Sequence, residues 1–364
     1  MANHPHLSSY DLLNEARPWA FSRAELTAGL RRHTGDPSLT ILELKEYDIP
    51  HQRPSIGQIR GLLAVCASGS GASEFPLVLK ETRGTTRTGT AGAGLREVSV
   101  YLTLDDHLPV RLPQLLAAHP GGDWLVLQLL TGGRHPEHWR AADYLVATDQ
   151  LVALHDRFWG LGSDLATYNW LARPLDLDFN IFLHAAATGL DNLSAHPNQN
   201  SLSQDQKLMA LLQNLITHAD KIIQHLRCTP STLLHGNFFP GNIHMHADGT
   251  LTVYDWEETA IGPGILDLVT FIQASRWWFD PLPIAVSAIT DHYRQRLQLA
   301  NGFIWADDDW QRQYDHALLW IFITQWIDLL AAIPDSMLSS RLPQLNAIWL
   351  EPVYAAALRR LPEA

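Results

Sequence analysis

Cysteine is nearly absent from this 364-residue chain, which contains only Cys66 and Cys228. Two cysteines so far apart in sequence do not indicate a disulfide framework or a cysteine-based zinc site. Their scarcity favours a reducing compartment, and we expect a cytoplasmic protein.

A surplus of positive charge is also absent. The chain has 26 lysine and arginine residues against 38 aspartate and glutamate residues, which gives a formal net charge of -12 with histidine neutral. Nucleic-acid binding needs many cations to neutralise phosphates. We therefore expect no nucleic-acid partner, and a nucleotide site here would depend on a few placed cations and metal ions.

Long uninterrupted hydrophobic runs are missing too. The most apolar long segment, residues 316–333, is interrupted by Gln325 and Asp328 and is shorter than a bilayer span, so we predict a buried helix and no membrane association. The N-terminus lacks a basic start followed by an apolar stretch, and no signal peptide is expected. What the chain does have is core material, since 46% of its residues are hydrophobic and only 18% are charged.

The first third of the chain is predicted to be rich in strands. Apolar residues at helical spacing predict a helix within residues 1–36, and the period changes at Thr40. Strands are expected at 40–49, 59–67, 75–80 and 124–130, and a helix at 95–104. Loops are expected where Pro, Gly, Ser and Thr concentrate, at 50–54, 68–73 and 84–94.

The rest of the chain is predicted to be mainly helical. Helices are expected at about 140–160, 204–227, 264–279, 283–299, 308–333 and 343–360. Residues 170–200 are less periodic and are expected to form a connecting or substrate-covering segment. The prediction is an α+β protein with a small antiparallel-sheet lobe at 1–131 and a larger, mainly helical lobe at 132–364.

The most informative stretch is residues 233–257. Residues 242–246 and 250–254 alternate in character around the turn sequence Ala247-Asp248-Gly249, which predicts a β-hairpin. Folding it at Asp248-Gly249 places Asn242 opposite Asp255, with the two α carbons roughly 5 Å apart. An amide oxygen and a carboxylate at the open end of a hairpin are well placed to share a hard cation such as Mg²⁺.

This stretch resembles the catalytic region of the aminoglycoside phosphotransferase and choline kinase family, which shares its core plan with protein kinases. The family pattern is His-Gly-Asp, four residues, Asn, and then a hairpin ending in Asp-(Trp/Phe)-Glu. Here it is His235-Gly236-Asn237, Asn242 and Asp255-Trp256-Glu257. The resemblance implies a protein-kinase-like two-lobe fold, metal binding by Asn242 and Asp255, and an Asp267 that braces the catalytic loop.

The resemblance extends over roughly residues 40–271 and implies a nucleotide site for ATP and Mg²⁺. A lysine at the end of the third strand would contact the phosphates and pair with a helix glutamate, a hinge backbone would hold the adenine, and a loop between the first two strands would cover the phosphates. The lysine is Lys80 and the glutamate is Glu97. The hinge residues are Gln128 and Leu130, and the loop residues are Ser55 and Gly57.

Asn237 departs from the family pattern, which has an aspartate as general base at this position. An amide cannot accept the proton of a substrate hydroxyl at any useful pH, and general-base assistance is worth on the order of 10²–10⁴ in rate. Phosphoryl transfer nevertheless depends mostly on positioning and on metal charge. With Asn237, Asn242 and Asp255 as the catalytic residues, the sequence predicts either a slow kinase or a protein that binds nucleotide without turnover.

Other conspicuous side chains are assigned structural roles. His244 and His246 lie on one face of a predicted strand without an evident third ligand, so a surface or packing role is favoured over a metal site. His235 is predicted to hold its loop by hydrogen bonds. Most of Trp277, Trp278, Trp320 and Trp326 are expected in the core, although they are also candidates to line an acceptor pocket.

The sequence therefore predicts an ATP-dependent phosphotransferase that transfers the γ-phosphate to a hydroxyl of a small molecule. The alternative is a pseudokinase that binds Mg-nucleotide with little or no turnover. A helical scaffold with a coincidental motif is opposed by the order of Lys80, Glu97, Asn242 and Asp255 along the chain. Neither the acceptor nor the oligomeric state is predicted, because fold analogy does not name a substrate.

Overall fold

The computed structural model describes residues 19–49, 58–82, 91–195 and 201–362. Its residues form two compact units: unit 1 is Met1–Thr82 with Gln114–Leu129, and unit 2 is Arg83–Pro113 with Leu130–Ala364. The predicted boundary after residue 131 lies near the end of unit 1, but residues 83–113, predicted with the first lobe, group with the helices of unit 2. The first half of the predicted helix at 1–36, the predicted turn at 50–54 and most of the predicted loop at 84–94 lie outside the described residues.

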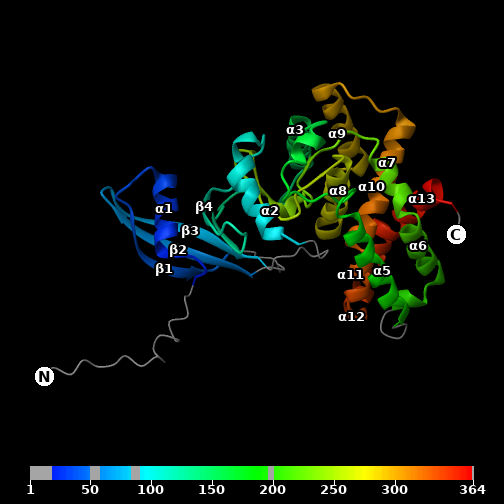
Figure 1. Ribbon diagram of the computed structural model, residues 1–364, viewed down its shortest axis with the longest axis horizontal. Helices are drawn as coiled ribbons and strands as arrows, with labels where there is room; N and C mark the ends of the chain where they lie inside the picture. The colour runs from blue at the N-terminus through cyan, green and yellow to red at the C-terminus, as the bar shows by residue number, and fades with distance from the viewer. Residues whose placement is uncertain (1–18, 50–57, 83–90, 196–200, 363–364) are drawn as a thin grey trace. The chain divides into compact units, whose positions relative to one another are not determined.

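Unit 1 is a five-stranded antiparallel sheet with one helix packed against it (Figure 1). The strand order is β1-β2-β3-β5-β4, and β2 and β3 form a long hairpin from Gln58 paired with Glu81 to Ser68 paired with Gly71. Its elements are α1 (Arg23–Thr34), β1 (Thr40–Tyr47), β2 (Gln58–Ser68), β3 (Gly71–Glu81), β4 (Leu115–Ala118) and β5 (Trp124–Gln128).

Two predictions for unit 1 were wrong in detail. Strand β4 was not predicted, because four residues are too few to show a period. Strand β3 begins at Gly71, inside the predicted loop at 68–73, because only Gly69 and Ser70 separate it from β2.

The core of unit 1 lies between α1 and the sheet. Helix α1 begins with a capping box between Ser22 and Glu25, and it buries Leu26 and Leu30. These two leucines belong to one apolar cluster with sheet residues that include Leu62, Leu77, Leu79 and Val126. The alternation of buried and exposed residues along the strands therefore fixes which face of the sheet the helix covers.

Replacing Leu62 by alanine tests this core. Leu62 is fully buried, so Leu62→Ala should lower the free energy of unfolding by about 2–5 kcal/mol through lost burial and the cavity left behind. The control is Leu42→Ala in β1, whose side chain is 58% exposed and whose loss should cost less than about 0.5 kcal/mol. Equilibrium urea unfolding measures both, and equal losses would contradict the assignment of the buried face.

Unit 2 contains mostly helices. They are α2 (Ala93–Ser99), α3 (Ala141–Arg157), α4 (Gly162–Leu165), α5 (Phe179–Ala195), α6 (Gln206–Thr217), α7 (Ala219–Leu226), α8 (Ile265–Phe279), α9 (Val286–Asn301), α10 (Asp307–Gln325), α11 (Ile327–Ala332), α12 (Asp335–Leu345) and α13 (Glu351–Arg360). Four short strands form two antiparallel pairs, β6 (Thr232–Leu234) with β9 (Ala260–Gly262) and β7 (Ile243–Met245) with β8 (Leu251–Val253).

Helix α10 is the centre of this unit, and α5, α6, α7, α8 and α13 pack around it. Its second half, from Ala317 to Ile323, is buried all round, as expected for a core helix. The predicted helix at 308–333 is divided at Trp326 into α10 and α11, and the one at 204–227 is divided at His218 into α6 and α7. Among the described residues, no helix has both the length and the apolar character that crossing a membrane requires.

The prediction for residues 170–200 was wrong, because α5 fills most of this segment. Its buried residues recur at helical spacing: Phe179, Phe182, Ala186, Leu190 and Leu193. Helix α5 packs against α11, so the segment belongs to the core of unit 2 and is not a connection over its surface. The last predicted helix, at 343–360, also starts earlier than expected, with α12 at Asp335, and passes through a π-helical turn at Asn346–Leu350 into α13.

Candidate functional site

The predicted β-hairpin is present, with its register shifted by one residue. Strands β7 and β8 pair Ile243 with Val253, and the Tyr254 N–H donates to the Asn242 carbonyl at 3.1 Å. Asn242 therefore lies opposite Tyr254, and the predicted pairing with Asp255 was wrong. The cause is the turn at 247–249, which is centred on Asp248 and not between Asp248 and Gly249 as predicted, with Gly249 in the left-handed region (φ +85°).

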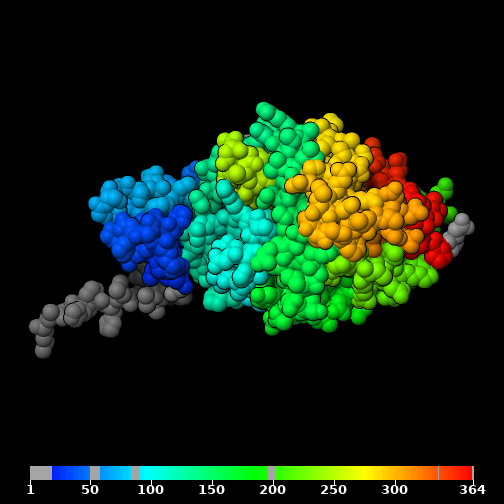
Figure 2. Space-filling model, turned by 90° about the horizontal axis from the view of Figure 1, so that it is seen from above, coloured from blue at the N-terminus to red at the C-terminus, as the bar shows by residue number. Residues whose placement is uncertain are grey.

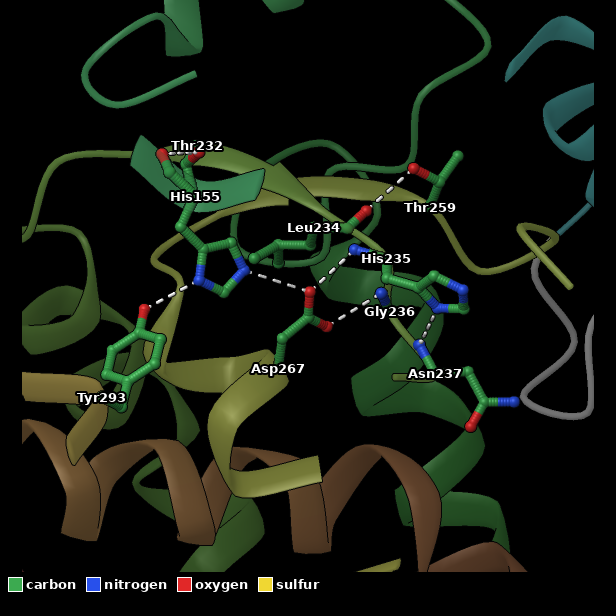
Figure 3. A network of polar contacts seen from close by, with 9 residues as sticks. All are labelled: His155, Thr232, Leu234, His235, Gly236, Asn237, Thr259, Asp267 and Tyr293. Atoms are coloured by element: carbon green, nitrogen blue, oxygen red, sulfur yellow. Dashed lines mark hydrogen bonds and ion pairs between the residues drawn. The ribbon is translucent and has the colours of Figure 1, made fainter. Parts of the chain in front are cut away.

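Asp267 holds the loop that follows β6. It lies in the first turn of α8 and is 1% exposed, and its carboxylate accepts the backbone N–H of His235 at 2.7 Å and of Gly236 at 2.9 Å (Figure 3). The Nε2 atom of buried His155, from α3, lies 3.3 Å from the same carboxylate. One buried carboxylate thus fixes the start of the loop to two helices, the bracing role that the family resemblance implies for Asp267.

Hydrogen bonds also fix the tautomer of His235. Its Nδ1 accepts the Asn237 N–H at 3.2 Å, and its Nε2 lies 3.1 Å from the Tyr254 carbonyl, which can only accept. The proton therefore sits on Nε2. The ring packs at a tilt of 47° against that of Trp256, whose side chain is fully buried, with 4.4 Å between centroids. Both nitrogens are engaged, which agrees with the structural role predicted for His235.

Gly236 has to be glycine. Its φ is +82°, and a Cβ atom there would lie 2.0 Å from the Glu258 carbonyl oxygen. The loop and the segment after Asp255 are therefore in backbone contact at this point. Thr259 adds a second link, because its hydroxyl donates to the Leu234 carbonyl at 2.8 Å (Figure 3).

Three carboxylates converge beside this loop. Oxygens of Glu97, Asp255 and Glu257 all lie within 4.8 Å of one another, and among the described residues no other group of three ligand side chains is placed to hold a metal ion. Asp255 is also the one non-glycine residue of the described chain with positive φ, at 68°. Strained backbone of this kind is concentrated at functional sites.

Asn242, which lies opposite Tyr254 in the hairpin, supplies an oriented amide. It is 7% exposed, and its Nδ2 donates to the Asn237 carbonyl at 2.9 Å. The donor end of the amide is therefore committed to the loop, and Oδ1 remains as the atom suited to a cation. Amide and carboxylate oxygens are the kind of donor that Mg²⁺ prefers.

Arg96 ties the helix that carries Glu97 to the same segment. It is 4% exposed, and its Nε donates to the Glu257 carbonyl at 2.7 Å while Nη1 donates to the Ala91 carbonyl at 2.7 Å. Burial lowers the pKa of this guanidinium, although Glu258, Asp178 and Glu257 partly offset the effect. The sequence did not predict Arg96 or Glu257 as site residues, although Arg96 directly precedes the predicted Glu97 and Glu257 follows Asp255 by two residues.

The other predicted nucleotide contacts are distributed over both units. Lys80 is buried on β3 in unit 1, paired in register with Leu125, while Glu97 lies on α2 in unit 2. Their ion pair remains a prediction. Gln128 ends β5 and Leu130 begins the return to unit 2, and the Gln128 N–H is already bonded to the Gln114 carbonyl at 3.0 Å. Ser55 and Gly57 lie outside the described residues.

The conspicuous histidines and tryptophans have mainly packing roles. The His244 and His246 rings are 4.6 Å apart, and His246 Nε2 is bonded to the Thr252 hydroxyl at 2.8 Å. Burial and the neighbouring His246 lower the pKa of His244, which opposes a second positive charge there.

Of the four tryptophans, two are buried, one is half-buried and one is exposed. Trp320 and Trp326 are buried, as predicted. Trp278 is 51% exposed and Trp277 half-buried, and Arg341 covers both of these rings at 5.6 and 5.2 Å. The prediction of a core position was wrong for Trp278.

Substitution of Gly236 tests the contact between the loop and the Asp255 segment. Gly236→Ala should destabilise the protein by about 2 kcal/mol or more beyond the left-handed strain of about 1–2 kcal/mol, because the new methyl group meets the Glu258 carbonyl. The matched control is Gly249→Ala, which has the same φ and nothing within 4 Å and should show the strain alone. Equal unfolding free energies for the two variants would contradict the close contact.

Comparison with known proteins finds several of similar structure. Ethanolamine kinase from Plasmodium vivax is similar in structure, with a TM-score of 0.53, 12% sequence identity, and coverage of 86% of this chain and 83% of that chain. A macrolide 2'-phosphotransferase from Brachybacterium faecium gives a TM-score of 0.46 and 18% identity over 88% of this chain and 97% of its own. An aminoglycoside phosphotransferase from Alicyclobacillus acidocaldarius gives a TM-score of 0.48 and 11% identity over 94% of this chain and 98% of its own.

The similarity to the ethanolamine kinase bears on fold alone and confirms the predicted α+β, protein-kinase-like class. No protein of curated function matches the sequence significantly. The model of the phosphotransferase enzyme family, by contrast, matches residues 68–313, which is well over half of the chain. The match includes the loop at His235, the hairpin and Asp267, and it confirms the predicted resemblance: the chain belongs to the phosphotransferase enzyme family.

Proposed function

We propose that this protein is an ATP-dependent kinase that transfers the γ-phosphate to a hydroxyl group of a small molecule. The observation that carries the proposal is the convergence of Glu97, from α2, with Asp255 and Glu257 within 4.8 Å of one another. The segment of the latter two continues to the Glu258 backbone, which contacts Gly236 of the Asn237 loop. Membership of the phosphotransferase family supports the reaction class.

The metal site that we propose is formed by Asp255 and Asn242. Arg96 keeps the Asp255-Glu257 segment in place through its bond to the Glu257 carbonyl, and the Asn237 carbonyl orients the Asn242 amide. Mg²⁺ bound by these oxygens would offset the charge of the phosphates during transfer. The Asn242 amide is thus held by the loop backbone, and the Asp255 segment is held two residues further on by Arg96, which reduces the reorganisation needed on binding.

The nucleotide contacts that we propose follow the family resemblance. Lys80 would bind phosphate oxygens and Glu97 would orient it. Since the Gln128 N–H is committed to Gln114, Gln128 would use its carbonyl toward adenine, and the N–H of Leu130 would serve as donor. Ser55 and Gly57 would cover the phosphates.

Asn237 would orient the acceptor hydroxyl without removing its proton. Its backbone N–H and carbonyl are bonded to His235 and Asn242, so the position of the residue is fixed while its side chain extends away from Asp267 (Figure 3). An amide can donate and accept hydrogen bonds but does not take a proton. The rate would then depend on alignment and on phosphate charge neutralisation.

A pseudokinase remains the second candidate because of Asn237. His235 cannot replace the missing base, since both of its ring nitrogens are engaged in hydrogen bonds. Asp267 cannot either, because it is 1% exposed and its carboxylate accepts two backbone N–H groups. Such a protein would retain the Mg-nucleotide site and lack turnover.

Removing the Asp255 carboxylate tests the metal site. Asp255→Ala should weaken binding of ATP at least about tenfold in the presence of Mg²⁺ and abolish the dependence of binding on Mg²⁺. Titration calorimetry with and without the metal measures both effects. Asp248→Ala is the control, because Asp248 belongs to the same hairpin but lies in its exposed turn, where it accepts bonds from Thr250. Metal-dependent binding retained by Asp255→Ala would contradict the proposed site.

Restoring the aspartate separates the two candidate functions. We expect the native protein to consume ATP with some member of a panel of small hydroxyl and amino-alcohol acceptors, and Asn237→Asp to be faster by about 10²–10⁴. Turnover found only in Asn237→Asp would identify the native protein as a pseudokinase. Absence of turnover and of nucleotide binding in both proteins would reject both functions.

A further inference from the structure

A buried chain of polar groups extends from Asp267 to helix α9. His155 Nε2 lies 3.3 Å from the Asp267 carboxylate, and His155 Nδ1 lies 2.7 Å from the hydroxyl of Tyr293 (Figure 3). The exposed fractions are 1% for Asp267, 0% for His155 and 1% for Tyr293. The chain thus links α9, α3 and α8 to the backbone of the loop that carries Asn237.

The hydrogen-bonding roles along this chain follow from chemistry. Asp267 accepts bonds from two backbone N–H groups, so its carboxylate favours a proton on the histidine nitrogen beside it. In the tautomer with Nε2–H the lone pair is at Nδ1, where it accepts the O–H of Tyr293. Burial, and secondarily the charge of Asp267, raises the pKa of Tyr293 well above its usual value, so the phenol keeps its proton.

Packing leaves the Tyr293 hydroxyl little freedom. Its ring lies edge-on to His155 at 5.8 Å between centroids and stacks on Trp310 at 6.2 Å. A Cβ atom at Gly264, just before α8, would lie 2.5 Å from His155 Nδ1 and 2.6 Å from the Tyr293 hydroxyl oxygen. Any larger residue at position 264 would collide with the hydrogen bond between His155 and Tyr293, so this bond requires the glycine.

Helix α9 is fastened to α3 on either side of Tyr293. Asp149 of α3 accepts bonds from His292 at 2.9 Å and from Arg296 at 2.8 Å. The outer face of α9 is part of the surface of unit 2, seen in gold in Figure 2, while Tyr293 faces inward. The bonds of Asp149 therefore fix the position of α9 on α3 without the help of the Tyr293 hydroxyl, and α9 in turn places that hydroxyl at His155.

We propose that Tyr293 is a positioning residue, whose hydroxyl holds His155 in the Nε2–H tautomer so that Asp267 keeps the His235-Gly236-Asn237 backbone in place. In the other tautomer, a lone pair on Nε2 would face the carboxylate and repel it. The loop would then lose part of its support, although no side chain that contacts ATP had changed. The kinetic part of this inference rests on the proposed kinase function; the tautomer does not.

The kinetic test is Tyr293→Phe, which removes a single oxygen atom. We expect kcat to fall about tenfold, as for the loss of one buried hydrogen bond that acts on the reacting geometry, with the KM for ATP unchanged. The control is Tyr144→Phe, because Tyr144 is equally buried on the same helix as His155, and its removal should leave kcat unchanged. Unchanged kcat in Tyr293→Phe, or equal losses in both variants, would overturn the positioning role.

The tautomer is measured by ¹⁵N NMR of the full chain labelled at histidine, with the His155 signals assigned by their absence in His155→Gln. The native protein should show a protonated Nε2 and an unprotonated Nδ1, and Tyr293→Phe should show a mixture. A protonated Nδ1 in the native protein would overturn the inference whatever the variant does. This readout holds in a protein without turnover, so failure of the proposed function and failure of this inference give different results.

Discussion

The structure around the loop depends on one buried carboxylate, that of Asp267. A charge removed from water is costly unless hydrogen bonds replace its solvation. Two backbone N–H groups and His155 provide that replacement, and its place in the first turn of α8 adds the favourable end of the helix dipole. Because the buried carboxylate needs these donors, the same hydrogen bonds that solvate it also hold the backbone of the loop in position.

The three converging carboxylates also depend on contacts that hold like charges in place. Oxygens of Glu97, Asp255 and Glu257 within 4.8 Å repel one another, so the fold has to hold them together. Buried Arg96 contributes by binding the Glu257 carbonyl from the helix that carries Glu97. This connection explains why α2 groups with unit 2, although its position in the sequence lies between strands of unit 1.

Much of the site was predictable because its residues are close in sequence. His235, Asn242 and Asp255 lie within one hairpin and its approach, and local turn chemistry with strand alternation brings them together. Even there the register was wrong by one residue, since the left-handed Gly249 makes a three-residue turn. Helix α5 and strand β4 were missed for different reasons: β4 is too short to show a period, and the apolar spacing of α5 was passed over.

The sequence by itself determined the α+β class, the succession of most strands and helices, and the family, because these follow from hydrophobic period and from a spaced motif. Only the tertiary structure decided to which unit α2 belongs and that His155 bridges Tyr293 and Asp267. It also decided that Gly236 and Gly264 admit no side chain. Some of these contacts join residues more than a hundred positions apart, such as His155 and Tyr293. No local period encodes such pairs; the packing of α3, α8 and α9 brings them together.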